Sequence, residues 1–316
     1  TETDLAGGRP VEPGDALVIA TSGTTGAPRG VVLTHAAVAA SAAASSARLD
    51  VTADDHWLAC LPLSHVGGLS VVTRALHADT RLTVLPGFDA AAVDAVGASL
   101  VSLVPTALRR VDAARFRRIL LGGSRPPADR PANCVTTYGM TETGSGIAYD
   151  GVPLDGVDIR VVDGEIHVRG PMLLRAYRDG TVPLVDGWFP TGDLGWLAPD
   201  GRVVVEGRRG DLIITGGENV WPEPVEDLIR QLPGVADVAV AGESDPEWGQ
   251  IVTAYVVPDG VPPTLEQLRD HVRAHLAAYH APRRLVLLSE LPRTALGKVP
   301  RSALRTASRH GIDAHG

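Results

Sequence analysis

The chain has 316 residues, a formal net charge of −8 and a hydrophobic fraction of 44%. These values suit two domains, or one large domain with an appendage. The negative charge, without a long basic run, argues against nucleic acid or an anionic membrane as a partner. No apolar stretch of about 18 residues and no charged-then-apolar leader is present. Two cysteines in apolar surroundings, Cys60 and Cys134, predict reduced thiols in a cytoplasmic protein.

A polar loop at residues 21–30 lies between two apolar runs, 16–20 and 31–33, that predict strands. Its hydroxyls, glycines and cation are Thr21, Ser22, Gly23, Thr24, Thr25, Gly26 and Arg29. Glycines let backbone amides turn toward an anion, and such a nest binds phosphate. A β-hairpin turn would have the same composition, and the Lys-Ser/Thr ending of a P-loop is absent.

The next polar cluster follows an expected strand at 57–62, after a helix at 35–49 that Thr34 could cap. The cluster contains Ser64, His65, Gly68 and Ser70. Residues after a strand end lie where open α/β sheets place ligands, although a lone histidine is more often structural. Arg74, on an expected helix at 69–77, would ordinarily be a surface cation.

Strands alternating with helices continue along the chain. The expected pairs are 81–85 with 90–96 and 100–104 with 106–111, followed by a strand at 118–121 that ends at Gly122, Gly123 and Ser124. Apolar strands alternating with helices predict an α/β fold with a mainly parallel sheet covered on both faces.

A further strand delivers an aromatic ring, a glycine, hydroxyls and one carboxylate within a few residues. These are Tyr138, Gly139, Thr141 and Glu142. Short alternating runs at 158–162, 165–169 and 202–206 then predict a small β-barrel-like subdomain, with a hairpin turn at Asp163-Gly164. Asp193, with Gly192 before it and Gly195 two residues after it, would ordinarily be a turn former.

A polar string at 207–211, with Arg208 and Asp211, predicts a domain boundary. We expect an N-terminal domain at 1–207, a hinge at 208–211 and a C-terminal domain at 212–316. Gly216 and Gly217 open the latter, and helices at 224–231 and 265–279 with strands at 235–240, 251–257 and 284–288 make it a small α/β domain. Lys298 stands on a glycine-containing loop, and a frayed tail is expected after Leu304.

Four strings in this chain resemble core motifs of the acyl-adenylate-forming superfamily, which includes acyl-CoA synthetases, peptide-synthetase adenylation domains and luciferases. They are Thr-Ser-Gly-Thr-Thr-Gly-Ala-Pro-Arg-Gly at 21–30, Tyr-Gly-Met-Thr-Glu at 138–142, Trp-Phe-Pro-Thr-Gly-Asp-Leu-Gly at 188–195 and Pro-Arg-Thr-Ala-Leu-Gly-Lys at 292–298. Arg29 stands where the family usually has lysine, so a cation is kept. The motifs agree in type, order and spacing over nearly the whole chain.

The resemblance implies a role for each motif. Residues 21–26 and Arg29 would bind the ATP phosphates; adenine and ribose would be bound by Gly122, Gly123, Ser124, Tyr138, Gly139, Asp193 and Arg208. Thr141 would contact the α-phosphate, Glu142 would hold Mg²⁺, and Lys298 would be the catalytic lysine. The acyl pocket would include Ser64, His65, Gly68, Ser70 and Arg74. His65 would also be a catalytic residue, and Arg74 would pair with a second carboxylate on the substrate if it is not a surface cation. Asp211 would be the hinge, and Gly216 and Gly217 would border a channel for CoA.

The string Leu-Pro-Leu-Ser-His-Val-Gly-Gly-Leu-Ser at 61–70 is most similar to o-succinylbenzoate–CoA ligases of menaquinone biosynthesis. This resemblance implies an enzyme that uses Mg²⁺ and ATP to form an acyl-adenylate and then transfers the acyl group to CoA. Most family members have a longer segment before the phosphate loop, so we expect a truncated N-terminal domain, as in short ligases of actinobacteria.

Three alternatives stay open at this point. The enzyme could be a CoA ligase for another aryl or alicyclic acid, or a stand-alone adenylation enzyme that loads a carrier protein. It could also be an inactive nucleotide-binding homologue, although the presence of Glu142, Asp193, Arg208 and Lys298 argues against that. The expected partners are a small carboxylic acid, ATP and CoA, and a homo-oligomer is left open.

Overall fold

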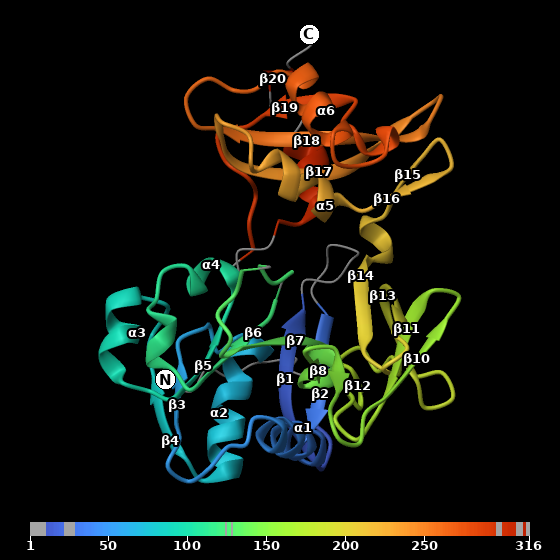
Figure 1. Cartoon of the computed structure of the whole chain (residues 1–316). Helices are drawn as coiled ribbons and strands as arrows, with labels where there is room; N and C mark the ends of the chain where they lie inside the picture. The colour runs from blue at the N-terminus through green and yellow to red at the C-terminus, as the bar shows by residue number, and fades with distance from the viewer. Residues whose placement is uncertain are drawn as a thin grey trace, which may run out of the picture. The chain divides into compact units, whose positions relative to one another are not determined.

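The computed structural model describes residues 11–21, 29–123, 125–127, 129–294, 299–307 and 312–313. The chain divides into two compact units, each described here by itself (Figure 1). Unit 1 comprises Thr1–Thr191 and Gly195–Val204, and unit 2 comprises Gly192–Leu194 and Val205–Gly316. Within the described ranges no helix is long and apolar enough to cross a membrane.

Unit 1 is built on a seven-stranded sheet in the order β4-β3-β5-β6-β7-β8-β9. Its strands are β3 (His56–Ala59), β4 (Arg81–Val84), β5 (Leu100–Leu103), β6 (Arg118–Leu121), β7 (Cys134–Met140), β8 (Ser145–Tyr149) and β9 (Val152–Pro153). The pairs from β4 to β7 are parallel, and β8 and β9 are antiparallel additions. The mainly parallel α/β sheet predicted from the alternating pattern is therefore confirmed.

Helices cover both faces of this sheet, as the buried side chains show. In β3, Trp57 and Ala59 belong to one core cluster with residues of α1 and α2, whereas Leu58 belongs to another with residues of α3 and α4. Alternate residues of a strand face opposite sides of a sheet. The helices are α1 (His35–Arg48), α2 (Val66–Ala78), α3 (Ala90–Val96) and α4 (Pro105–Leu108).

The helix ends follow local chemistry. Thr34 caps α1 as predicted, because its hydroxyl accepts a hydrogen bond from Ala37 N at 3.1 Å. The predicted start of α2 at residue 69 is wrong, since the helix begins at Val66. The carbonyl of His65 accepts hydrogen bonds from Gly68 N and Leu69 N, so the two glycines form the first turn. Gly68 fits there because a Cβ would overlap the carbonyl oxygens of Leu61 and Pro62.

Two smaller sheets complete unit 1. One has the order β1-β2-β12, with β1 (Asp15–Thr21), β2 (Arg29–Thr34) and β12 (Ala176–Tyr177). The other has the order β10-β11-β13-β14, with β10 (Asp158–Val162), β11 (Glu165–Arg169), β13 (Phe189–Leu197) and β14 (Val203–Arg208). Residues 192–194 of β13 and 205–208 of β14 are assigned to unit 2. The hairpin at Asp163-Gly164 is confirmed, since both residues have positive φ. The barrel-like expectation is wrong: the order runs from one edge to the other without closing, since four short strands are too few to close a packed barrel.

Unit 2 contains a six-stranded sheet in the order β16-β15-β18-β19-β20, with β17 also paired to β18. The strands are β15 (Ile213–Thr215), β16 (Glu218–Val220), β17 (Val235–Asp245), β18 (Gly249–Pro258), β19 (Arg284–Leu287) and β20 (Ile312–Asp313). Side chains of α5 (Pro222–Ile229) and α6 (Leu265–Arg273) share one core cluster, and Leu304 of α7 (Arg301–Ala307) belongs to a second.

Two predictions for unit 2 need correction. The tail after Leu304 is not frayed throughout, because α7 continues to Ala307 and β20 pairs antiparallel with β19. Leu304 is fully buried, and this anchors the helix on the sheet. The predicted helix to residue 279 ends at Arg273, since His275 N bonds to the Val272 carbonyl three residues earlier and tightens the turn.

Asp55 holds together the segments that precede three strands of unit 1. Its carboxylate accepts hydrogen bonds from Thr52 N at 2.9 Å, Ser99 Oγ at 2.7 Å and Arg117 Nη2 at 2.6 Å. Burial acts to raise the pKa of Asp55, but the hydrogen bonds from Arg117, Thr52 and Ser99 outweigh it, and the pKa is lowered.

We expect Asp55→Asn to lower stability at neutral pH by about 1–3 kcal/mol, because a buried ionic hydrogen bond is lost. A lowered pKa means that this stabilisation is present above the pKa of an unfolded aspartate and is lost as the pH falls through the folded value. Thermal unfolding of the variant and the parent should therefore converge in acid. Asp158→Asn removes a similar but exposed contact to Arg169 and should change nothing measurable. Equal melting temperatures at neutral pH would contradict this role for Asp55.

Candidate active site

The ends of the predicted phosphate loop lie side by side in unit 1. β1 and β2 pair antiparallel, so Thr21 is opposite Arg29. The Thr21 hydroxyl donates to the Arg29 carbonyl at 3.3 Å. The loop members Ser22, Gly23, Thr24, Thr25 and Gly26 lie outside the described residues. The structure therefore places the two ends of the loop and its cation, and the loop's contacts stay a prediction.

Arg29 is held by an aromatic ring and an exposed carboxylate. Its guanidinium carbon lies 3.5 Å from the centroid of the Tyr177 ring, on β12. One guanidinium nitrogen lies 3.5 Å from Asp179, whose side chain is 54% exposed. An exposed ion pair of this length contributes little, so the buried Tyr177 ring is the firmer contact.

Glu142 lies on a short 3₁₀ turn, η2 (Thr141–Thr143), directly after β7. Its Oε1 accepts a hydrogen bond from the Tyr177 hydroxyl at 3.0 Å, and its carbonyl accepts one from Leu174 N at 2.7 Å. Thr141, one residue earlier, is half-buried. Tyr177 thus contacts both the loop cation and the carboxylate predicted to hold Mg²⁺.

The predicted adenine-binding residues lie at the ends of β6 and β7. Gly122 approaches Thr137 closely, since an added Cβ would lie 2.5 Å from the Thr137 hydroxyl, and Gly123 has a φ of +86°. The pairing of β7 with β8 shifts register between Tyr138 and Gly139, which is a bulge that redirects a side chain. Ser124 lies outside the described residues.

Arg74 is buried, so the surface alternative is wrong. The residue is 2% exposed. Its guanidinium donates to Ser45 Oγ at 3.0 Å, to Ser145 Oγ, and to the Tyr149 hydroxyl at 3.4 Å. Among the described residues it has no carboxylate partner, and its buried Nη1 has no hydrogen-bond partner. Arg74 is therefore a buried cation held by neutral groups.

The other predicted acyl-pocket residues lie at the start of α2. His65 is the extended N-cap residue and is half-buried, whereas Ser64 before it is exposed. Gly68 and Ser70 are buried in the first turns of the helix. Arg74 donates a hydrogen bond to Ser145, which lies three residues after Glu142. The segment 142–145 therefore contains both the predicted metal-binding carboxylate and a partner of Arg74.

The predicted ribose pair is brought together in unit 2. Arg208 Nε lies 2.7 Å from Asp193 Oδ1, with the Asp193 side chain only 7% exposed. Gly216 and Gly217 form the turn between β15 and β16, both at positive φ. A Cβ on Gly216 would lie 2.8 Å from the Trp248 ring, whereas Gly217 faces open space. Lys298 lies outside the described residues.

Arg301 gathers three carboxylates in unit 2, including that of the predicted hinge residue. It bonds to Asp211 at 3.2 Å, Glu223 at 2.9 Å and Glu226 at 3.0 Å. Burial raises the pKa of Glu226, although the positive charge of Arg301 opposes the shift. The pKa of Arg301 is also raised, because Glu226, Glu223 and Asp211 outweigh the effect of burial. Sequence reasoning missed this cluster because its members are spread over 90 positions.

The carboxylate of Glu142 has one oxygen that could bind Mg²⁺. With Oε1 of Glu142 bonded to Tyr177, Oε2 has no hydrogen bond among the described residues. No group of three or more His, Cys, Asp or Glu in the described part of the chain could hold a metal ion by itself. A single carboxylate suits Mg²⁺, which keeps waters and substrate phosphates as its other ligands.

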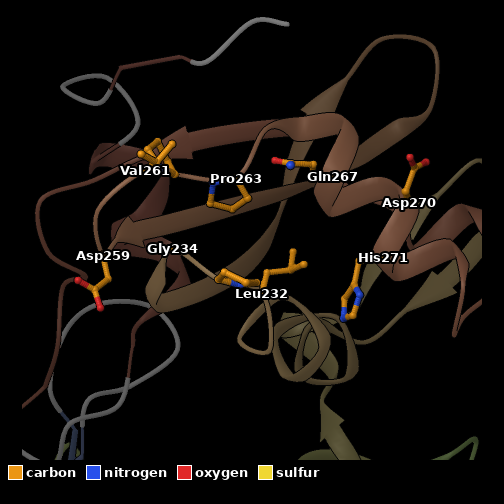
Figure 2. A pocket seen from close by; sticks show the side chains of 10 residues that line it. Leu232, Gly234, Asp259, Val261, Pro263, Gln267, Asp270 and His271 are labelled. Atoms are coloured by element: carbon orange, nitrogen blue, oxygen red, sulfur yellow. The ribbon is translucent and has the colours of Figure 1, made fainter.

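A pocket of about 690 Å³ lies in unit 2 beside α6 (Figure 2). It is lined by Leu232, Gly234, Val261, Pro263, Gln267 and His271, among others, and by none of the predicted site residues. The Gln267 side chain already accepts from Thr264 N at 2.8 Å in the capping box of α6. The lining brings together no set of groups that indicates a reaction.

Comparison with known proteins places the chain in a family. Residues 6–178 match the model of the AMP-binding enzymes, and residues 224–298 match that of the AMP-binding enzyme C-terminal domain. A 2-succinylbenzoate–CoA ligase of Bacillus cereus is 38% identical over 91% of this chain and 69% of its own length. A probable 2-succinylbenzoate–CoA ligase of Mycobacterium tuberculosis is 41% identical over 94% and 85%.

Solved structures agree with the sequence matches. The o-succinylbenzoate CoA synthetase of Bacillus subtilis, in complex with its acyl-adenylate intermediate, superposes with a TM-score of 0.83 and 32% identity, over 91% of this chain and 68% of that one. The same enzyme with ATP and a magnesium ion gives a TM-score of 0.82 and 32% identity, over 91% and 69%.

The chain belongs to the family of AMP-binding enzymes. Within that family it groups with the 2-succinylbenzoate–CoA ligases, which are AMP-forming acid–thiol ligases. The resemblance drawn from the motifs is confirmed, together with the α/β fold and the class of enzyme. The roles of individual residues and the domain boundary at 207–211 stay predictions.

Gly139 gives a test of how closely β7 and β8 must approach beside Tyr138 and Glu142. An added Cβ would lie 2.6 Å from Gly146 Cα and would overlap the Ser145 carbonyl oxygen. We expect Gly139→Ala to cost about 1–3 kcal/mol through overpacking and to reduce ATP–pyrophosphate exchange. Gly87→Ala is the control, because a Cβ there meets nothing within 4 Å. If both variants have the melting temperature and the ATP–pyrophosphate exchange rate of the parent, the close approach of β7 and β8 is not required for function.

Proposed function

We propose that this chain is an ATP-dependent 2-succinylbenzoate–CoA ligase that forms the acyl-adenylate and then the CoA thioester. The relatives and the solved structures given above support the class of reaction. The single structural observation that supports a substrate with two carboxylates is the buried guanidinium of Arg74. We also propose that the enzyme acts in the cytoplasm, where ATP and CoA are available; both of its cysteines are free and buried.

Arg74 supports the substrate because a buried cation without an anion is costly. Its three partners are hydroxyls, and one of its nitrogens has no partner in the described part of the chain. A carboxylate that enters this region would supply both the missing charge and the missing acceptor. 2-Succinylbenzoate has two carboxylates, so one can be activated while the other pairs with Arg74.

In the first step an oxygen of the substrate carboxylate attacks the α-phosphorus of ATP. The bond from the α-phosphorus to the bridging oxygen breaks, and pyrophosphate leaves with that electron pair. Negative charge develops on the phosphoryl group and on pyrophosphate, so cations and amide donors held in position stabilise the transition state. Arg29, at the end of the phosphate loop, would supply one of these charges.

Glu142 and Thr141 act on the same phosphates in this proposal. Glu142 would hold Mg²⁺, which when bound neutralises charge on the phosphate oxygens. Thr141, on the same 3₁₀ turn, would donate to the α-phosphate. Tyr138 and the glycines at 122 and 123 would bind adenine, and the Asp193 carboxylate would accept hydrogen bonds from the ribose hydroxyls beside Arg208.

In the second step the CoA thiol, as its thiolate, attacks the carbonyl carbon of the mixed anhydride. The carbon–oxygen bond to the phosphate breaks, and AMP leaves. Lys298 would serve the first step, and the Gly216-Gly217 turn would admit the pantetheine arm. We propose that a change of backbone conformation at Asp211 separates the two steps; in the present structure its carboxylate is bonded to Arg301.

The substrate assignment is tested by AMP formation with a panel of acids. We expect turnover with 2-succinylbenzoate and CoA, and little turnover with benzoate or alicyclic monoacids. Arg74→Met should raise the KM for 2-succinylbenzoate by at least about 30-fold, because a buried charged hydrogen bond is lost, while the KM for ATP stays unchanged. Rapid turnover of monoacids, or an unchanged KM, would contradict the assignment. Turnover only with a carrier protein in place of CoA would favour the adenylation alternative.

Lys298→Ala separates the two half-reactions. We expect the variant to lose ATP–pyrophosphate exchange by about 100-fold or more, because a positioned charge at the phosphoryl group is removed. Thioester formation from supplied acyl-AMP and CoA should be nearly unchanged. A similar loss in both half-reactions would contradict this division. Arg202→Ala removes an exposed cation paired with Asp200 outside every motif, so it is the control and should leave exchange unchanged.

A further inference from the structure

Tyr177 contacts both Arg29 and Glu142, the two charged groups predicted to bind the phosphates and the magnesium ion, and none of the motifs described above includes it. It is the last residue of β12, which pairs antiparallel with β2, so that Tyr177 is opposite Val31. β2 begins at Arg29 and leads directly out of the phosphate loop. Tyr177 is 8% exposed, and its side chain contacts groups on both β2 and η2.

The first contact fixes the carboxylate of Glu142. The Tyr177 hydroxyl donates to Oε1 at 3.0 Å, which leaves Oε2 free of hydrogen bonds among the described residues. A hydrogen bond to one oxygen of a metal-binding carboxylate sets its orientation and tunes its affinity for the ion. The backbone supports the same geometry, because Leu174 N donates to the Glu142 carbonyl at 2.7 Å.

The second contact fixes the guanidinium of Arg29. The ring lies 3.5 Å from the guanidinium carbon, which is a close cation–π contact with a buried ring. The other partner of Arg29, Asp179, is exposed and 3.5 Å away. Arg29 can therefore exchange Asp179 for phosphate oxygens while the ring holds its position. The Arg178 N–H donates to the Gly30 carbonyl at 2.6 Å and keeps β12 against the start of β2.

We infer that Tyr177 is a positioning residue for ATP binding: its hydroxyl orients Glu142 toward the magnesium ion of Mg-ATP, and its ring orients Arg29 toward the phosphates. The inference rests on the proposed function only in that ATP is the substrate. The two contacts use different atoms of one side chain, so they separate by substitution. Tyr177→Phe removes the hydroxyl and keeps the ring, whereas Tyr177→Leu removes both.

The test is calorimetric titration of ATP into the protein without acid substrate, so that no turnover occurs, at saturating Mg²⁺ and in EDTA. In the parent, Mg²⁺ should increase the affinity for ATP, and in Tyr177→Phe this increase should be about 10-fold smaller. In EDTA the Tyr177→Phe variant should bind ATP with the affinity of the parent. Tyr177→Leu should also bind several-fold more weakly in EDTA, because Arg29 loses its ring. Arg29→Met should lose at least as much ATP affinity in EDTA, because the cation itself is removed, and Tyr177→Leu added to it should lower that affinity no further.

Tyr255→Phe is the matched control, since Tyr255 is also a buried tyrosine whose hydroxyl donates to a glutamate, Glu243 in unit 2. It should bind ATP like the parent at saturating Mg²⁺ and in EDTA. The inference is overturned if Tyr177→Phe behaves like Tyr255→Phe, or if its affinity falls equally with and without Mg²⁺. A parent that binds Mg-ATP but forms no AMP with 2-succinylbenzoate would overturn the proposed substrate and leave this inference standing.

Discussion

The short pairing between β12 and β2 is the constraint on which the arrangement of the candidate site in unit 1 depends. It places a two-residue strand, Ala176–Tyr177, beside the strand that leaves the phosphate loop. Tyr177, on β12, donates a hydrogen bond to the Glu142 carboxylate. Leu174, just before β12, donates its backbone N–H to the Glu142 carbonyl, so the same turn is held a second time. Segments about 150 residues apart in sequence, at Arg29 and Tyr177, are thereby held in one arrangement. A site for a polyphosphate needs such rigidity, because its charges must be in place before the reaction begins.

The partners of each charged group distinguish structural charges from those available to a substrate. Asp55 is saturated by Arg117, Ser99 and Thr52, and Arg301 is surrounded by carboxylates. Such pairs have little left to offer a ligand. Arg74 is held by hydroxyls, Arg29 mainly by a ring, and Glu142 by one phenol. A charge with neutral partners is not neutralised within the protein, so it can still pair with an opposite charge on a ligand, such as a carboxylate, a phosphate or a cation.

The sequence predicted most of the framework because the framework follows local rules. Buried strands such as β3 and β5 are short apolar runs, and Thr34 and Asp163-Gly164 are strong cap and turn signals. The start of α2 was misplaced because Gly67 and Gly68 disfavour a helix by propensity, whereas packing against Leu61 and Pro62 requires a residue without Cβ. The open four-stranded sheet could not be told from a barrel, since closure depends on strand pairing and not on alternation.

In the candidate site, too, local sequence patterns were predictable and contacts between distant residues were not. The resemblance indicated Arg29, Glu142, Arg74 and Asp193, and the structure shows which neighbours hold them. Tyr177 was missed because a two-residue strand has no pattern, and the Arg301 cluster was missed because it joins distant positions. Contacts between residues far apart in sequence leave no mark on composition or spacing in one chain.

The central claim is that the acyl group is activated by direct transfer of AMP to the carboxylate. It is tested most directly with 2-succinylbenzoate whose carboxylates carry ¹⁸O, incubated with the enzyme, ATP and CoA, followed by mass spectrometry of the products. The account predicts that each AMP released gains one ¹⁸O atom, because the carboxylate oxygen that attacked the α-phosphorus stays on the phosphate when the thiol displaces it. Label in pyrophosphate or inorganic phosphate, or AMP without label, would contradict the account.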